Sequence, residues 1–287
     1  MTYYCSLAEA RDEILATANT VDDNALLRRV QMVSRRVNQL MGGRTRRDWF
    51  WPTSKLEKVP LNARHIDSYF NTLHLRGLPP LLAITTVLAD TTDVTAVTEG
   101  YPQGEPYFQM LRITSSGDPW YSYLDDCDDP AYASVTGVWG CHSDYSNAWT
   151  QVDTLAAIQT VGATTFTVAD VDGADPDGIT PRLSPGQLVK IESEYQLVTA
   201  TNTGNNVVTA TRAQGGTTAA QHASGSGVSV WQTEDPVRRI VARQAALLVA
   251  RQGAFQVETV DGVGTISYPQ DLLGELAAVL SEYTNGG

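Results

Sequence analysis

One stretch decides the fold of this chain: residues 22–52, with the sequence DDNALLRRVQMVSRRVNQLMGGRTRRDWFWP. Apolar side chains recur every three or four positions in its first part, which predicts a helix over 23–41 with one narrow apolar stripe. The stripe consists of Leu26, Val30, Val33, Val37 and Leu40. Polar residues at 22–24 can cap the start of the helix, and the two glycines at 42–43 can end it. We therefore interpret this stretch as an element that packs and docks, not as a catalytic segment.

Arginines flank the apolar stripe and continue past the predicted end of the helix. They are Arg28, Arg29, Arg35 and Arg36 on the helix, then Arg44, Arg46 and Arg47, which precede the aromatic residues Trp49, Phe50 and Trp51. The basic segment can contact DNA phosphates. Alternatively, its aromatics anchor a loop whose arginines pair with carboxylates of a neighbouring protein. Because the chain carries a net charge of −12, we favour the neighbouring protein, and we interpret Arg238 and Arg239 on a later helix in the same way.

Composition narrows the classes of protein. The 287 residues suffice for one large domain or two smaller ones, and 42% hydrophobic residues suffice for a core. The acidic balance argues against the usual basic type of nucleic-acid-binding protein. No signal-peptide pattern opens the chain and no apolar run approaches about 18 residues, so we expect no membrane span. Cys5, Cys127 and Cys141 lack metal-binding spacing, so we expect reduced thiols, with a Cys127–Cys141 disulfide as the alternative.

Helices are predicted near both ends of the chain. Ser6 and Glu9 have the pattern of a capping box at the start of a short helix. Asp235 and Pro236 have the N-cap and first-turn chemistry of a longer one. Pro269 opens a last helix with an apolar face. This face comprises Leu272, Leu273, Leu276, Val279 and Leu280.

Between these helices the pattern changes to β-branched and apolar runs bounded by Gly, Pro and Asp, which predicts strands. In the first half of the chain the clearest predicted strands are 81–88, 107–113 and 134–142. Glycines in the last of these runs suggest a bulge or a close approach of two backbones. The range 152–231 differs, because Thr, Val, Ala and Gly dominate it. Its short strands, with a hairpin around 192–194, predict a small all-β module.

The order of these segments predicts an α+β fold. We expect the N- and C-terminal helices to pack into one helical bundle with a few strands, and a small all-β domain to be inserted between them. The expected core comprises residues 1–151 and 232–287, and the expected inserted module comprises residues 152–231. Insertions whose ends lie close in space are well tolerated by a host domain.

No group of residues has the spacing of a catalytic or metal site. The histidines His65, His74, His142 and His222 are not spaced as zinc ligands. The acidic run 170–178 resembles the start of a calcium loop, but Pro181 stands where the closing glutamate belongs, so we favour an acidic turn over a weak calcium site. The P-loop and the G-x-S-x-G elbow are both missing. We therefore expect no enzyme activity, no cofactor and no required metal.

Several segments together resemble the head–tail connector (adaptor) proteins of tailed bacteriophages, which form a ring below the portal. The pattern consists of the helical start, GGRTRRDWFWP at 42–52, LPPLLAITTV at 78–87, GVWGCH at 137–142 and DPVRRIVARQAALLVARQ at 235–252. The resemblance covers most of 1–150 and 232–287. The block 152–231 is similar to a β module that recurs in phage structural proteins.

This resemblance implies a structural protein of the virion neck that is made in the host cytoplasm. It implies a ring of about twelve copies, which binds the portal protein and a stopper or tail-side neck protein. DNA would pass through the ring without sequence-specific binding, and no membrane is involved. In similar proteins the C-terminal region reaches the portal. The resemblance thus assigns portal docking to Leu272, Leu276, Leu280 and Tyr283. The alternative is that this helix only packs on the helix at 23–41.

Two other functions stay open. One is a different neck or tail protein of the virion that shares the β module. The other is a carbohydrate-binding or hydrolytic protein of a β type, which six Trp and twelve Tyr make conceivable. A carbohydrate module has no need of arginine-rich amphipathic helices at both ends of the chain, so we favour the connector.

Overall fold

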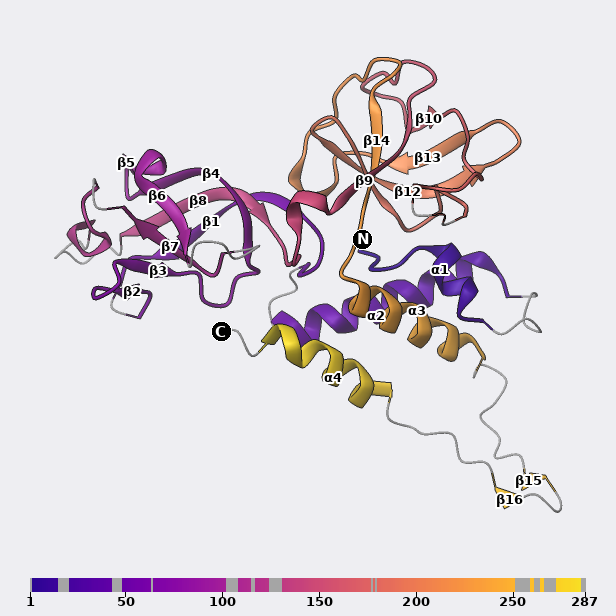
Figure 1. Cartoon of the computed structure of the whole chain (residues 1–287), viewed down its shortest axis with the longest axis horizontal. Helices are drawn as coiled ribbons and strands as arrows, with labels where there is room; N and C mark the ends of the chain where they lie inside the picture. Colours follow the sequence, from indigo (N-terminus) through magenta and orange to yellow (C-terminus); the bar gives the residue numbers. More distant parts are fainter. Residues whose placement is uncertain are drawn as a thin grey trace. The chain divides into compact units, whose positions relative to one another are not determined.

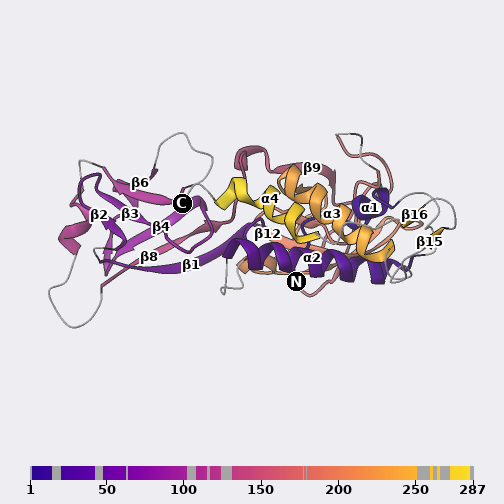
Figure 2. The same cartoon turned by 90° about the horizontal axis from the view of Figure 1, so that it is seen from below.

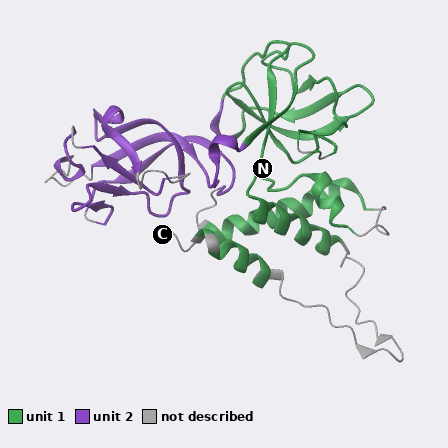
Figure 3. Cartoon of the chain, in the orientation of Figure 1, with its two compact units in different colours: residues 1–43, 149–214, 218–286 green, residues 44–148, 215–217, 287 purple. Residues whose placement is uncertain are grey.

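The computed structural model divides the chain into two compact units, which Figure 3 distinguishes by colour. Unit 1 comprises residues 1–43, 149–214 and 218–286, and unit 2 comprises residues 44–148, 215–217 and 287. The residues that the structure describes are 2–14, 21–42, 48–62, 64–101, 108–114, 117–123, 131–176, 178, 180–250, 259–260, 264–265 and 272–284.

Antiparallel β-sheet is the main structure of the described residues. Fourteen strands form three antiparallel sheets, and β15 (Thr259–Val260) pairs with β16 (Gly264–Thr265) in a separate hairpin. Only four α-helices and four short 3-10 helices accompany them in the described part of the chain. Figure 1 labels the α-helices. The prediction of an α+β helical bundle with a few strands and a small inserted β domain is therefore wrong. It failed because strands of two to four residues are too short to show the alternation that identifies a strand in sequence.

Unit 2 contains two four-stranded sheets. The first has the order β1–β8–β4–β5 and the second the order β2–β3–β7–β6. The strands of the first sheet are β1 (Thr53–Pro60), β8 (Tyr132–Trp139), β4 (Leu81–Ala89) and β5 (Thr92–Asp93). The strands of the second are β2 (Ile66–Asp67), β3 (Thr72–His74), β7 (Met110–Ile113) and β6 (Thr98–Tyr101). Asn71 and Asp90, with φ of 52° and 54°, adopt the left-handed turn conformation that asparagine and aspartate tolerate between such short strands.

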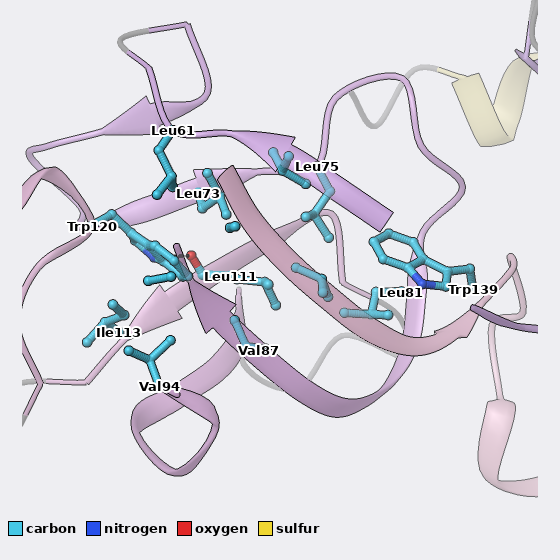
Figure 4. Packing of buried hydrophobic residues seen from close by; sticks show 14 residues of the cluster. Leu61, Leu73, Leu75, Leu81, Val87, Val94, Leu111, Ile113, Trp120 and Trp139 are labelled. Carbon is cyan, nitrogen blue, oxygen red and sulfur yellow. Dashed lines mark hydrogen bonds between the residues drawn. The ribbon is translucent and has the colours of Figure 1, made fainter. Parts of the chain in front are cut away.

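The core of unit 2 is a cluster of buried side chains from both sheets (Figure 4). Leu73 and Leu111 come from the second sheet and Leu81 from the first, and all three are fully buried. Two fully buried tryptophans complete the cluster. The Nε1 group of Trp120 donates to the Leu111 carbonyl oxygen at 3.1 Å, and that of Trp139 donates to a backbone carbonyl of β1 at 3.1 Å. Each indole therefore buries its apolar surface without leaving its polar group unpaired.

The three predicted strands in this unit are confirmed as β4, β7 and β8. Strand β7 is shorter than predicted, and β8 begins before residue 134 and ends at Trp139, before the predicted end at 142. The close backbone approach suggested by the glycines of β8 is also confirmed. A Cβ atom on Gly137 would lie 2.2 Å from the Ala83 carbonyl oxygen of β4, closer than any side chain tolerates. The pairing of β4 with β8 is irregular beside Ala83, as a bulge requires.

Unit 1 contains a six-stranded antiparallel sheet with the order β10–β13–β12–β11–β14–β9. Its strands are β9 (Trp149–Thr154), β10 (Thr165–Thr167), β11 (Leu188–Ile191), β12 (Glu194–Asn202), β13 (Val207–Thr211) and β14 (Gly227–Trp231). The predicted hairpin is confirmed, because β11 pairs with β12 through Ile191 opposite Glu194, and Glu192 in the turn has a φ of 54°. Whether residues 152–231 fold independently of the rest of unit 1 stays a prediction.

The helices of unit 1 are α1 (Leu7–Asp12), α2 (Asp23–Gly42), α3 (Asp235–Ala250) and α4 (Leu272–Thr284). The predicted helices that begin with the 22–24 cap and with Asp235 are confirmed as α2 and α3. The capping box of α1 is confirmed as well, since the Glu9 amide donates to Ser6 Oγ and the Ser6 amide donates to Glu9 Oε2. Helices α3 and α4 both pack against α2 and against each other (Figure 2).

The apolar stripe of α2 packs as the heptad spacing predicts. Leu26, Val30 and Val37 are fully buried and Val33 is 5% exposed, whereas Leu40 near the end of the helix is half-buried. The burial of one narrow stripe leaves the neighbouring positions of α2 free to line a different surface.

Candidate functional site

A groove on unit 1 is lined by residues of α2, α3 and α4. Its volume is about 540 Å³, which lies within the usual range for ligand-binding clefts. The α2 contribution includes Arg28, Met32 and Arg35, at spacings of four and three. These positions lie on one face of the helix, next to the buried stripe. The sequence of α2 thus serves two surfaces, an apolar one toward the core and an arginine-bearing one toward the groove.

The floor of the groove is apolar. Leu248 of α3 and Leu276 of α4 line it together with Val33 of α2. Leu276 is 2% exposed and Val33 5% exposed, while Met32 at the edge is 44% exposed. An exposed methionine above a leucine floor is an adaptable apolar surface, which suits contact with another apolar side chain.

The rim of the groove is basic. Arg35 and Arg36 form no ion pair with any carboxylate in the part of the chain that the structure describes, and Arg36 donates only to Gln39 Oε1, at 3.2 Å. Arg28 has Asp22 as its nearest carboxylate, at 4.0 Å, and both side chains are well exposed. A contact of that length between exposed groups neutralises little charge. The rim therefore presents three arginines, although the whole chain carries a net charge of −12.

One polar group in the groove is left unsatisfied. The Nε2 atom of Gln31 is buried and has no hydrogen-bond partner, and Gln31 lines the groove. By contrast, Gln244 on α3 also lines the groove but donates to Glu275 Oε2 of α4 at 3.2 Å. A buried donor without an acceptor costs free energy, so Gln31 is a weak point in the packing beside the groove.

The structure brings together four of the residues that the sequence assigned to interaction. They are Arg28, Arg35, Arg36 and Leu276, all of which line the groove. Arg29 of α2 and Arg239 of α3 do not line it. Arg238 pairs within the chain instead, with Glu9 at 2.9 Å and with Asp235 at 2.5 Å.

The other predicted interaction residues lie elsewhere. Leu280 of α4 is 2% exposed and packs inside unit 1, and Tyr283 is half-buried. Leu272 is the first residue of α4. Trp49 is half-buried and Trp51 is 4% exposed, both in unit 2. Arg44, Arg46 and Arg47 lie outside the described residues.

A second polar cluster lies inside the six-stranded sheet of unit 1, and sequence reasoning missed it. Glu194 is fully buried and receives hydrogen bonds from the Nε group of Arg212 at 2.9 Å and from the backbone amides of Ala213 and Ala220 at 3.1 and 3.0 Å. His222, also fully buried, places Nε2 2.9 Å from Glu194 and Nδ1 3.0 Å from Glu192. Both ring nitrogens of His222 thus lie within hydrogen-bond distance of a carboxylate.

This cluster holds Glu194 in its ionised form. Burial by itself raises the pKa of Glu194, but the hydrogen bonds from Arg212, from the Ala220 amide and from His222 outweigh it and lower the pKa from 4.5 to about 2. Arg212 also donates to the Thr160 and Ala163 carbonyl oxygens at 2.6 and 3.3 Å. Because these groups form hydrogen bonds with one another, we interpret the cluster as a structural element that stabilises the sheet.

The acidic run at 170–178 forms an ion pair within the chain. Arg182 contacts Asp170 at 3.1 Å and Asp153 at 3.4 Å, so a guanidinium stands where the calcium alternative would need a cation. Asp177 lies outside the described residues. Over the described ranges, no group of three or more His, Cys, Asp or Glu side chains is arranged to hold a metal ion. Cys5 is buried, which raises the pKa of its thiol, and Cys127 lies outside the described residues.

No helix in the described part of the chain is both long enough and apolar enough to cross a membrane. No known protein family, no curated protein and no solved structure matches this chain. The groove must therefore be interpreted from its own chemistry.

Proposed function

We propose that this chain is a structural virion protein, a head–tail connector of a tailed bacteriophage, and that its groove is a docking surface for a neighbouring protein. The observation that carries the proposal is the basic rim of Arg28, Arg35 and Arg36 around an apolar floor. An apolar centre with a charged rim is the usual composition of a protein–protein interface. The sequence pattern of the arginine-bearing helices supports the connector class.

In this proposal the work of the protein is mechanical. Copies of the chain form a closed ring of about twelve through contacts that repeat between neighbours. The ring sits below the portal protein, extends the DNA channel and offers a face to the stopper or tail-side neck protein. An acidic chain suits such a channel, because like charge lets a polyanion slide instead of binding it. The proposal includes no enzymatic step, no cofactor and no membrane.

Portal docking at the C-terminal end belongs to the same proposal, but the structure limits how α4 can take part. Leu276 and Leu280 are each 2% exposed, so neither offers apolar area while α4 is packed on its neighbours. A portal contact through this end therefore falls to the outer side of α4, with Tyr283 near it, or requires α4 to detach.

The proposal is tested by the number of copies per virion. Purified particles of a phage that encodes this chain are digested, and quantitative mass spectrometry compares peptides from this chain with peptides from the portal protein. A ring that matches the portal predicts a ratio close to one to one. A ratio that corresponds to only one or two copies of this chain per particle would exclude the connector ring. The absence of the chain from particles would exclude it as well.

A further inference from the structure

The groove on α2, α3 and α4 restricts the chemistry of its ligand. Val33 and Leu276 in its floor are nearly fully buried, so the apolar area open to a ligand comes chiefly from the exposed Met32 and the half-buried Leu248. A ligand gains free energy by covering these two side chains with apolar groups. A nucleic-acid backbone presents phosphates and sugars and has no aliphatic side chain for this floor. The floor therefore favours a protein ligand.

The rim adds a requirement for negative charge. Arg35 and Arg36 have no carboxylate partner among the described residues, and Arg28 has only a long contact to Asp22. Carboxylates placed against these guanidinium groups would form charge-assisted hydrogen bonds. A basic ligand would be repelled at the same positions. The ligand therefore carries carboxylates beside its apolar side chains.

The unsatisfied Gln31 points to the same kind of ligand. Its buried Nε2 lacks an acceptor in the free protein. A rotation of the side chain that turns this amide into the groove would let an oxygen of the ligand accept from it. The walls of the groove are helices, whose backbone groups bond within each helix, so they offer no free edge to an extended strand. A helical ligand satisfies its own backbone, as in other complexes where a helix lies in a groove.

We propose that the groove binds an amphipathic, acidic helical segment of a partner protein, with apolar residues at helical spacing and carboxylates on both sides of that stripe. This inference rests on the proposed function, because it names the ligand class of the same docking surface. It adds a chemical identity that the connector proposal lacks, and it can fail separately.

The test is an unbiased peptide selection on the full-length chain. A display library of random peptides of about 16 residues, long enough for about four helical turns, is selected on immobilised protein. We expect enriched peptides with apolar residues three and four positions apart and several Asp or Glu between them. Affinities of the best peptides are then measured by fluorescence anisotropy on wild-type protein and on variants.

Charge reversal on the rim is the decisive variant. The double substitution R35E/R36E should weaken binding roughly tenfold or more, because it opposes the ligand carboxylates with like charge. The matched control is R64E/R76E, which changes the net charge equally at two exposed arginines of unit 2. This control should leave the affinity within about twofold, because neither arginine lines the groove.

A second variant separates ligand binding from folding. Gln31→Met removes the unsatisfied donor, so the melting temperature should not fall, yet binding should weaken roughly fivefold through the lost hydrogen bond. Gln151→Met is the control and should leave the affinity unchanged, because Gln151 is exposed and does not line the groove. Equal affinity of the wild-type and Gln31→Met proteins would remove the assigned role of Gln31.

Three outcomes overturn the inference: no enriched peptide, enriched peptides without acidic residues, or affinities that R35E/R36E leaves unchanged. A single-stranded DNA oligonucleotide is assayed in parallel. Arginine-dependent binding of this oligonucleotide without peptide enrichment would replace the protein ligand with a nucleic acid. The selection uses purified protein alone, so its failure does not affect the copy number in the virion, and a failed copy-number test does not affect the selection.

Discussion

At the scale of single residues, the fold satisfies some polar groups completely and leaves others open. Glu194 is buried and receives hydrogen bonds from Arg212, from His222 and from two backbone amides. Gln31 is partly buried and its amide nitrogen has no partner. The first arrangement stabilises the sheet of unit 1, whereas the second leaves free energy available for a ligand.

The buried cluster predicts a large stability difference between two neighbouring glutamates. Glu194→Gln leaves the guanidinium of Arg212 buried without its counter-charge, so we expect a loss of about 3–5 kcal/mol in the free energy of unfolding. Glu192→Gln is the control, because the Glu192 side chain is 53% exposed. In this variant His222 retains its contact with Glu194. Urea unfolding followed by circular dichroism measures both. Similar losses for the two variants would contradict the structural role of the cluster.

The same cluster predicts how stability depends on pH. The pKa of Glu194 is lowered from 4.5 to about 2 in the folded protein, and that of Glu192 is lowered too, chiefly by its hydrogen bond with His222. A lowered carboxyl pKa gives stability that is fully present above the unfolded value and is lost as the pH falls toward the folded value. We therefore expect stability to fall between about pH 4.5 and pH 2. The fall should be shallower in Glu194→Gln, and identical slopes would contradict this assignment.

At the scale of secondary-structure elements, α2 is the element that joins folding to docking. Its stripe of Leu26, Val30 and Val37 is fully buried, whereas Arg28 and Met32 on the adjacent positions line the groove. Core packing and groove lining use different faces of α2, so substitutions can change one without changing the other.

Substitutions on the two faces of α2 should have different effects on stability. Leu26→Ala removes a fully buried side chain and should cost about 2–5 kcal/mol. Met32→Ala, at a side chain that is 44% exposed, should change stability by less than about 1 kcal/mol. Thermal unfolding compares the two variants. A large loss for Met32→Ala would mean that the groove edge belongs to the core.

The loop around Asp170 should not depend on a metal ion. Arg182 already contacts Asp170 and Asp153, so a cation gains little there. We expect the melting temperature to be the same in EDTA and in EDTA with excess calcium, which serves as the control. A drop of several degrees in EDTA alone would contradict this expectation and would restore the weak calcium site.

Individual helices and strands were predicted from the sequence better than the way in which they pack together. Helix α2 was predictable because five apolar residues repeat over its length, and α1 because Ser6 and Glu9 cap it through local hydrogen bonds. Strands β2 and β5 have two residues each, so an alternation of apolar and polar residues cannot identify them in the sequence. The groove arises where three helices meet, and the Glu194 cluster joins residues from distant strands and turns. Neither leaves a local pattern, although the arginines of the rim could be named in advance.

At the scale of the whole molecule, two units each hold their own buried cluster. The unit 2 cluster includes Trp120 and Trp139, and the unit 1 sheet has a separate cluster that includes Val189 and Ile191. The four α-helices are the smaller part of the regular structure in the described residues, in which β-strands predominate. The connector proposal requires a surface on this acidic chain that binds a neighbouring protein. The basic rim of Arg28, Arg35 and Arg36 is the surface that we propose for this contact.

The connector ring is tested most directly by cryo-electron microscopy of the virion neck. Reconstructed particles of a phage that encodes this chain should show it as a closed ring below the portal. Density of a neighbouring protein should lie against Arg35, Arg36 and Leu276. A particle in which this chain forms no ring, or a ring whose subunits leave the groove of α2, α3 and α4 open to solvent, would contradict the account.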